Sequence, residues 1–240
     1  MSAVLIDGIA VSKAIRAQWK QRVEALKARG VTPGLAVILV GENPASQVYV
    51  RNKVKACGEV GLYSELHPFP AGIAQEAVLA KIEDLNRDPR IHGILVQLPL
   101  PPHFDNSKVL EVISAEKDAD GFHLYNLGGL VSGGGVFPPC TPYGVMALLD
   151  FYKIPIEGSN AVVVGRSNIV GKPMALMLLQ RDATVAVCHI KTRDLAQFTI
   201  AADILVVAAG QPNLVTAPMV RTGAGVVDVL TLACVVRIAG

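Results

Sequence analysis

The sequence predicts an α/β protein with mostly parallel sheets, and three observations support this. Short apolar runs typical of buried strands alternate with segments of helical periodicity along the chain. The stretch 161–173, AVVVGRSNIVGKP, joins a β-branched run to a helical run through a glycine turn. The 240 residues are enough for two modest domains, each with its own core. Strands that alternate with helices pair in parallel, because each helix returns the chain to the same end of the sheet.

The N-terminal half is expected to contain three helices and three strands. The first helix has apolar positions from Val11 to Leu26 and stops at Gly30. The elements expected after it are strand 35–40 (LAVILV), a turn over 41–46, a helix through QVYVRNKVKACGEVG, strand 64–69, helix 75–86 and strand 91–98.

The C-terminal half is expected to begin with a loop over 133–142 and a helix over 143–152 that connect two domains. The elements expected after them are strand 161–164, helix 174–179, strand 184–188, helix 195–201, strand 203–207 and strand 225–229. We therefore predict one domain over residues 1–140 and a second over residues 141–240.

The composition limits the kinds of partner that the protein is expected to bind and the cellular compartment in which we expect it. Hydrophobic residues make up 51% of the chain, but no apolar run reaches the length of a membrane span, and the N-terminus lacks the basic region of a signal peptide. The net charge of +2 gives no reason to expect nucleic acid. Four distant cysteines (Cys57, Cys140, Cys188, Cys234) form no CxxC motif, so we expect free thiols in a reducing cytoplasm. No cluster has metal-ligand spacing, so no metal is expected.

The stretch 161–173 is the main functional signal from the residues alone. Gly165 ends the apolar strand, and Gly171 precedes the apolar helical run 174–179. Such a strand, tight turn and helix start bind phosphate, because the helix N-terminus offers free N–H groups and a positive dipole end. Ser167 takes the place of the second glycine in the usual fingerprint, and its hydroxyl can bond a phosphate. An ordinary turn between a strand and a helix is the alternative.

Polar residues of the N-terminal half suggest a second site. Tyr49 and Lys53 are four positions apart on one predicted helix, so they share a face and can form an acid–base pair. A solvated lysine beside a half-buried tyrosine is the alternative. Gln97 lies at the end of an apolar strand, where open α/β sheets bind ligands, although a surface amide is also common there. Asp120 lies in the loop EKDADGFH and is either functional or a turn residue, whereas Asp118 and His123 are expected to be loop residues only.

Five motifs in sequence resemble one family. They are YVRNKVKAC, GILVQLPLP, KDADGFH, PPCTP and GRSNIVGKP, and the resemblance runs from about Leu5 to about Val229. Together they resemble the bifunctional methylenetetrahydrofolate dehydrogenase/cyclohydrolase family. The resemblance implies an N-terminal α/β folate domain, a C-terminal Rossmann-type NAD(P)-binding domain, tetrahydrofolate derivatives as substrates in one-carbon metabolism, and a homodimer. It also implies oxidation of methylene-tetrahydrofolate to methenyl-tetrahydrofolate, followed by hydrolysis to formyl-tetrahydrofolate.

The resemblance also implies roles for individual residues. Lys53 matches the catalytic lysine of the cyclohydrolase step, and Tyr49 matches the tyrosine that stacks near the folate. Gln97 matches the glutamine that bonds this lysine and tunes its proton affinity. Asp120 matches the carboxylate that holds the pterin ring. The remaining residues implied in binding are Val96, Leu98 and Pro99 for the folate, and Gly165, Arg166, Ser167, Ile190 and Thr231 for the cofactor.

The expected cofactor is NADP rather than NAD. Many NAD enzymes carry an acidic residue after the second strand of the dinucleotide unit, where it bonds the ribose 2′-hydroxyl. Here the strand ends in Cys188-His189-Ile190-Lys191, without an acid. Arg166, with Lys191, can pair with a 2′-phosphate instead. Ile190 stands where the family often has a polar or basic residue, so we expect only backbone or apolar contact from it.

The segment after Val229 departs from the family. The family continues with a Gly-Ile-Asn turn, a Pro-Gly-Gly loop and a final helix, whereas this sequence reads LTLACVVRIAG. Thr231 falls where the family has an isoleucine that contacts the cofactor. The missing segment normally covers apolar surface on the first domain, so we expect lower stability or a partner over that surface. Two alternative functions remain at this point: an inactive folate- or nucleotide-binding member, and a different NAD(P) dehydrogenase.

Overall fold

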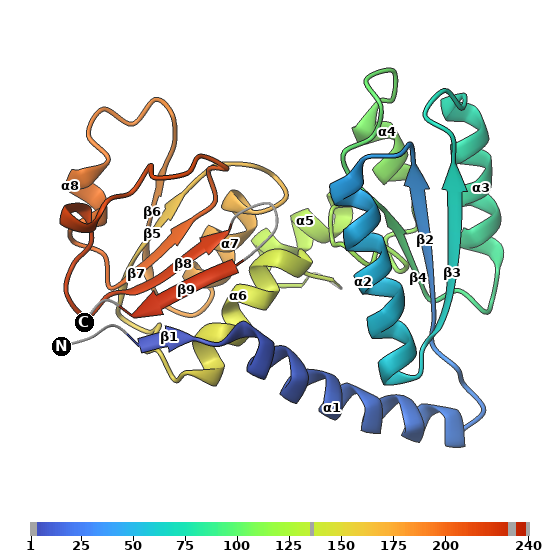
Figure 1. Ribbon diagram of the computed structural model, residues 1–240, viewed down its shortest axis with the longest axis horizontal. Coiled ribbons are helices and arrows are strands. Elements are labelled where there is room, and N and C mark those ends of the chain that lie inside the picture. Colours follow the sequence, from blue (N-terminus) through green and yellow to red (C-terminus); the bar gives the residue numbers. More distant parts are fainter. Residues whose placement is uncertain (1–3, 135–136, 230–233, 239–240) are drawn as a thin grey trace. The chain divides into compact units, whose positions relative to one another are not determined.

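The computed structural model describes residues 4–134, 137–229 and 234–238. The chain forms two compact units (Figure 1). The N-terminal unit is Ser12–Asn126, and the C-terminal unit combines Met1–Val11 with Leu127–Gly240. The first residues of the chain thus join the C-terminal unit, because β1 (Val4–Ile6) pairs antiparallel with β9 (Cys234–Ile238).

The N-terminal unit is built on a parallel three-stranded sheet in the order β3-β2-β4. Its strands are β2 (Gly34–Val40), β3 (Tyr63–Phe69) and β4 (Gly93–Val96). Its helices are the greater part of α1 (Gly8–Ala28), α2 (Pro44–Val60), α3 (Gln75–Arg87) and α4 (Asn106–Val112). The next helix, α5 (Leu124–Ser132), begins at the end of this unit and continues into the other.

Helices cover both faces of the three-stranded sheet, which explains why β2 is apolar at successive positions. Ala36, Ile38 and Val40 pack on one face, against Val78, Ile82 and Leu85 of α3. Val37 and Leu39 point to the other face, where they meet Val50 of α2. Strands that are buried on both faces lack the alternation of a half-exposed strand. Figure 1 shows α2 and α3 lying along this sheet.

The C-terminal unit is built on a six-stranded sheet in the order β1-β9-β8-β7-β5-β6. Strands β8, β7, β5 and β6 are parallel, and β9 is antiparallel to both of its neighbours. The other elements of this unit are β5 (Asn160–Val164), β6 (Thr184–Cys188), β7 (Ile204–Val207), β8 (Gly225–Val229), α6 (Cys140–Phe151), α7 (Gly171–Leu179), α8 (Ala196–Thr199) and a 3₁₀ turn (Ala217–Met219).

The structure confirms the predicted α/β class and its mostly parallel sheets, and it adds elements that the sequence did not predict. These are β1, β9, α4 and α5. Helix α6 begins at Cys140, three residues before the expected start, because Pro142 is tolerated in a first helical turn. Residues 127–140, which the sequence-based division placed with the N-terminal domain, belong to the C-terminal unit.

In the part of the chain that the structure describes, no helix is both long enough and apolar enough to cross a membrane.

Candidate active site

Three of the predicted residues meet in the N-terminal unit. Lys53 Nζ lies 3.4 Å from Gln97 Oε1, to which it donates, and 4.0 Å from Asp120 Oδ1. The three side chains come from α2, from the residue that follows β4, and from the loop after α4. An ammonium, an amide and a carboxylate that converge in this way can exchange a proton and hold a polar ligand.

Helix α2 fixes where Tyr49 and Lys53 lie. The helix begins after Asn43, whose side chain accepts from the Ser46 N–H at 3.1 Å, and ends at Gly61, which adopts a left-handed conformation at φ +85°. Tyr49 and Lys53 are one turn apart, so they lie on the same side of the helix. Both residues are half-buried.

Gln97 is held by the sheet. Its backbone N–H donates to Ile38 O at 2.9 Å, so the pairing of β4 with β2 extends one residue past the end of β4. Its side-chain Nε2 donates to Leu98 O at 2.7 Å. This bond turns the amide oxygen toward Lys53. Val96, just before Gln97, is buried, and Leu98 and Pro99, which are joined by a cis peptide bond, follow Gln97.

Asp120 lies in a mostly buried position, with 17% of its side chain exposed. Burial raises the pKa of its carboxyl; the nearby Lys53 ammonium opposes the rise, and the Asp118 carboxylate adds to it. A buried carboxylate with little compensation favours a ligand that brings hydrogen-bond donors.

Sequence reasoning took Asp118 for a loop residue and missed that its side chain is buried, with 1% of the residue exposed. Its carboxylate accepts from Gly121 N at 3.1 Å, from His123 N at 2.8 Å and from Asn126 Nδ2 at 2.9 Å. Asn126 is fully buried. An aspartate followed by a glycine three residues later is a signal of a side-chain-capped turn, and this signal was present in KDADGFH.

The predicted phosphate-binding turn lies in the C-terminal unit, between β5 and α7. Gly165 has a φ of +135°, and a Cβ built there would lie 2.4 Å from Ala208 O. A Cβ at Gly171 would lie 2.2 Å from Gly165 O. Both positions therefore require glycine, and the turn is compact enough for a phosphate to approach its backbone.

The structure corrects one detail of this turn. We expected free N–H groups at the helix start, but Ser167 Oγ accepts from Val170 N at 3.2 Å and Gly171 N at 3.3 Å, and Ser167 O accepts from Lys172 N at 3.0 Å. Ser167 therefore caps α7. The backbone N–H groups of the turn itself, residues 166–169, donate to no acceptor among the described residues.

Of the residues expected to distinguish NADP from NAD, Ile190 and Lys191 lie just after β6, and Arg166 lies in the turn after β5. His189 N donates to Thr192 Oγ1 at 2.8 Å, and Lys191 N donates to His189 Nδ1 at 3.1 Å, which shapes a tight loop after the strand. Ile190 is 91% exposed on this loop, and Arg166 and Lys191 are exposed too. Thr231 lies outside the described residues.

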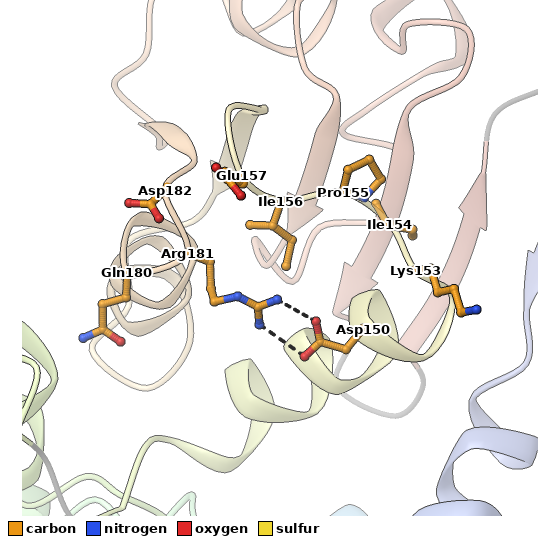
Figure 2. A pocket seen from close by; sticks show the side chains of 9 residues that line it. All are labelled: Asp150, Lys153, Ile154, Pro155, Ile156, Glu157, Gln180, Arg181 and Asp182. Carbon is orange, nitrogen blue, oxygen red and sulfur yellow. Dashed lines mark hydrogen bonds and ion pairs between the residues drawn. The ribbon is translucent and has the colours of Figure 1, made fainter.

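A surface pocket of about 440 Å³ in the C-terminal unit contains none of the predicted site residues. Figure 2 shows its most prominent feature, the paired contact of Arg181 with Asp150 at 2.9 and 3.2 Å. Both side chains are about half exposed, so the ion pair contributes only about 0–1 kcal/mol to stability. We assign this pocket no part in the chemistry.

The fold and the two sites define a class of protein: a two-unit α/β enzyme with a polar reaction centre in one unit and a dinucleotide turn in the other. Comparison with known families identifies which one. Residues 6–120 match the catalytic domain of tetrahydrofolate dehydrogenase/cyclohydrolase, and residues 139–235 match its NAD(P)-binding domain. The chain belongs to the tetrahydrofolate dehydrogenase/cyclohydrolase family.

Individual relatives agree with this assignment. The bifunctional protein FolD of Nitrosospira multiformis is 62% identical over 229 residues, which are 95% of this chain and 80% of that protein. The crystal structure of the bifunctional FolD enzyme from Campylobacter jejuni is 51% identical, with a TM-score of 0.91 over 93% of this chain and 79% of that one. The Trypanosoma brucei FolD structure, which is complexed with NADP cofactor and an inhibitor, is 42% identical, with a TM-score of 0.90 over 94% of this chain and 78% of that one.

These matches decide between the functions left open by the sequence. Both units match one family, which excludes a different NAD(P) dehydrogenase that shares only the dinucleotide-binding half. The identity to bifunctional relatives over most of the chain favours an active bifunctional dehydrogenase/cyclohydrolase over an inactive binding protein.

Proposed function

We propose that this chain uses Lys53, Gln97 and Asp120 to oxidise methylene-tetrahydrofolate with NADP and to hydrolyse the methenyl product to formyl-tetrahydrofolate. The observation that carries this proposal is the convergence of the three side chains within the unit that matches the family's catalytic domain. We assign the folate chemistry to this N-terminal unit and cofactor binding to the C-terminal unit.

Lys53 serves the hydrolytic step. Methenyl-tetrahydrofolate is a cation, and water adds to its methenyl carbon; one carbon–nitrogen bond then breaks, and one proton is released as the formyl group forms. Lys53 Nζ is held by Gln97 Oε1, so it can relay this proton or stabilise the charge that develops. Tyr49, on the same side of α2, provides a ring against which the folate stacks.

Asp120 binds the folate ring. The pterin carries an amino group next to a ring N–H, and an ionised carboxylate offers two oxygens to such a donor pair. These donors also compensate for the burial that raises the pKa of Asp120. Val96, Leu98 and Pro99 complete the folate site beside Gln97.

Gly165, Arg166 and Ser167 hold the cofactor, which accepts the hydride when it is bound. The structure fits this assignment, because the turn is closed by two glycines that tolerate no side chain and keeps free N–H groups at 166–169. NADP is the cofactor present in the Trypanosoma brucei relative, and Arg166 supplies the positive charge that a 2′-phosphate requires. Ile190 contributes only backbone or apolar contact, and Thr231 is proposed as a further cofactor contact.

The chain is further proposed to act in the cytoplasm as a homodimer. Cys57 and Cys188 are free thiols, which suits a reducing compartment, and burial raises the pKa of both. The dimer is supported by the resemblance to the family.

A spectrophotometric assay of the purified chain with methylene-tetrahydrofolate and either NADP⁺ or NAD⁺ tests this function. We expect turnover with a preference for NADP⁺ in kcat/KM of at least about tenfold, since one hydrogen bond to a charged group contributes about 1.5–3 kcal/mol. Arg166→Ala should reduce that preference, whereas Arg51→Ala, a change at an exposed position in the other unit, should not. Absence of turnover, or equal use of NAD⁺, would contradict the proposal.

A further inference from the structure

Among the residues whose burial the structure describes, the proposed function leaves one buried charged group without a role, the carboxylate of Asp118. It lies two residues before Asp120, is 1% exposed, and accepts hydrogen bonds from Gly121, His123 and Asn126. All three donors follow Asp120 in the chain: two are backbone N–H groups of the loop, and the third is a side chain near the start of α5. Such a group costs free energy to bury and is retained where it fixes a geometry.

The part of the loop that precedes Asp120 is held by a separate set of hydrogen bonds. Residues 117 and 119 pair with β4, through Ile94 N donating to Lys117 O and Ala119 N donating to Ile94 O at 3.2 Å. The Lys117 ammonium donates to Leu85 O at 3.1 Å and Asp88 O at 2.9 Å, the carbonyls at the end of α3. The loop is therefore anchored before Asp120 by the sheet and by α3. The part that follows is held, among the described residues, through Asp118: its carboxylate accepts from Gly121, His123 and Asn126, and its backbone O accepts from Gly121 N at 3.3 Å.

We propose that Asp118, together with Asn126, is a positioning residue that holds the Asp120 carboxylate in place for the folate ring. Asp118 bonds the backbone at residues 121 and 123, directly after Asp120, and Asn126 ties the same carboxylate to Ala115 O, before Asp120, through a second bond of 2.9 Å. Asp118 and Asn126 thus connect the parts of the loop before and after Asp120. This inference rests on the proposed binding of folate by Asp120.

Replacement of Asp118 by asparagine disrupts the hydrogen bonds that its carboxylate accepts, with little change in side-chain volume. An asparagine side chain has one acceptor oxygen, so its NH₂ group must face either the Gly121 N–H or the two donors at His123 and Asn126. Two donors that face each other cannot bond, and the loop must shift to relieve this. A shift of the binding group by about 1 Å can cost about 100-fold.

The test measures steady-state kinetics of the purified D118N chain with methylene-tetrahydrofolate and NADP⁺. We expect KM for methylene-tetrahydrofolate to rise between about 10- and 100-fold while KM for NADP⁺ stays unchanged, because the turn proposed for the cofactor lies in the other unit. A loss of folded protein alone lowers the rate at saturation and moves neither KM. The matched control is D105N, which also removes a carboxylate that accepts two backbone N–H groups, but at the start of α4; its folate KM should stay at the wild-type value.

Three comparisons separate the outcomes. An unchanged folate KM in a folded D118N chain overturns the inference. If D118N does not fold, Asn126→Ala decides, because it removes one donor and keeps the carboxylate: a raised folate KM supports the inference, and an unchanged one overturns it. Asp120→Asn is measured in parallel, so that a wild-type folate KM in that variant reveals a failure of the proposed function and not only of the role of Asp118.

Discussion

At the scale of single residues, Asp120 shows how function opposes stability. Burial and the Asp118 carboxylate raise the pKa of its carboxyl, and Lys53 only partly compensates. An acid with a raised pKa in the folded state binds more protons folded than unfolded between the two pKa values. Folding therefore becomes less favourable as the pH rises through that interval. The proposed function explains why the free enzyme carries this cost: the folate would supply the missing donors.

Asp120→Asn is therefore expected to raise the thermal unfolding midpoint at neutral pH while weakening folate binding. The gain should vanish at a pH below the ordinary range of an aspartate, where the wild-type carboxyl is protonated in both states. Thermal unfolding monitored by circular dichroism across this pH range measures the effect. Asp84→Asn, at an exposed position on α3, is the control and should change stability by no more than about 0.5 kcal/mol. A lower midpoint for Asp120→Asn at neutral pH would contradict this account.

The sequence motifs were enough to name residues that lie close together in the fold, whereas their roles stay predictions and the contacts that support them could not be read from the sequence. Lys53, Gln97 and Asp120 were all named from the sequence, and the structure brings them together. Asp118 was taken for a loop residue, because its hydrogen bonds come from donors up to eight positions away that only the folded loop brings together. Ser167 was named for phosphate binding, but its cap on α7 was missed.

At the scale of elements, the turn between β5 and α7 depends on glycine. A Cβ at Gly171 would lie 2.2 Å from Gly165 O, a backbone atom that has no rotamer by which to move aside. We expect Gly171→Ala to destabilise the chain by about 1–3 kcal/mol, as overpacking does, and to weaken NADP binding. Denaturant unfolding and titration with NADP measure the two effects.

Gly144→Ala is the matched control for that change. Gly144 lies within α6 in the same unit, and a Cβ there would meet no atom within 4 Å. Alanine is favoured over glycine in a helix by about 0.5–1 kcal/mol, so this variant should be as stable as wild type or more so. Equal destabilisation by the two substitutions would show that the close packing at Gly171 is not the cause.

The helices and strands that were predicted have a strong local sequence pattern, and those that were missed do not. Strands buried on both faces, such as β2 and β5, are continuous apolar runs and were easy to recognise. Helix α5 contains Gly128 and Gly129, which weaken helix propensity, and α4 is only seven residues long. Strands β1 and β9 pair across nearly the whole chain, and no local pattern records such a partner.

At the scale of the whole molecule, the chemistry is divided between two units of different architecture. The N-terminal unit carries the Lys53, Gln97 and Asp120 cluster on a three-stranded sheet, and the C-terminal unit carries the glycine turn on a six-stranded sheet. In the proposed function, hydride transfer needs both units, because the folate and the cofactor are assigned to different units. The proposed hydrolysis needs only the cluster and water. The two activities should therefore respond differently to a change at Lys53.

The most direct test of this account is the pair of rates catalysed by Lys53→Met, measured side by side. Loss of the proton relay should reduce hydrolysis of methenyl-tetrahydrofolate by about 10²- to 10⁴-fold, the usual contribution of general acid–base catalysis, and reduce the NADP-dependent oxidation far less. Lys55→Met is the control, since its 75% exposed side chain lies on the same helix; both of its rates should match wild type. If Lys53→Met keeps both activities, or loses both to the same extent, the role assigned to Lys53 is wrong.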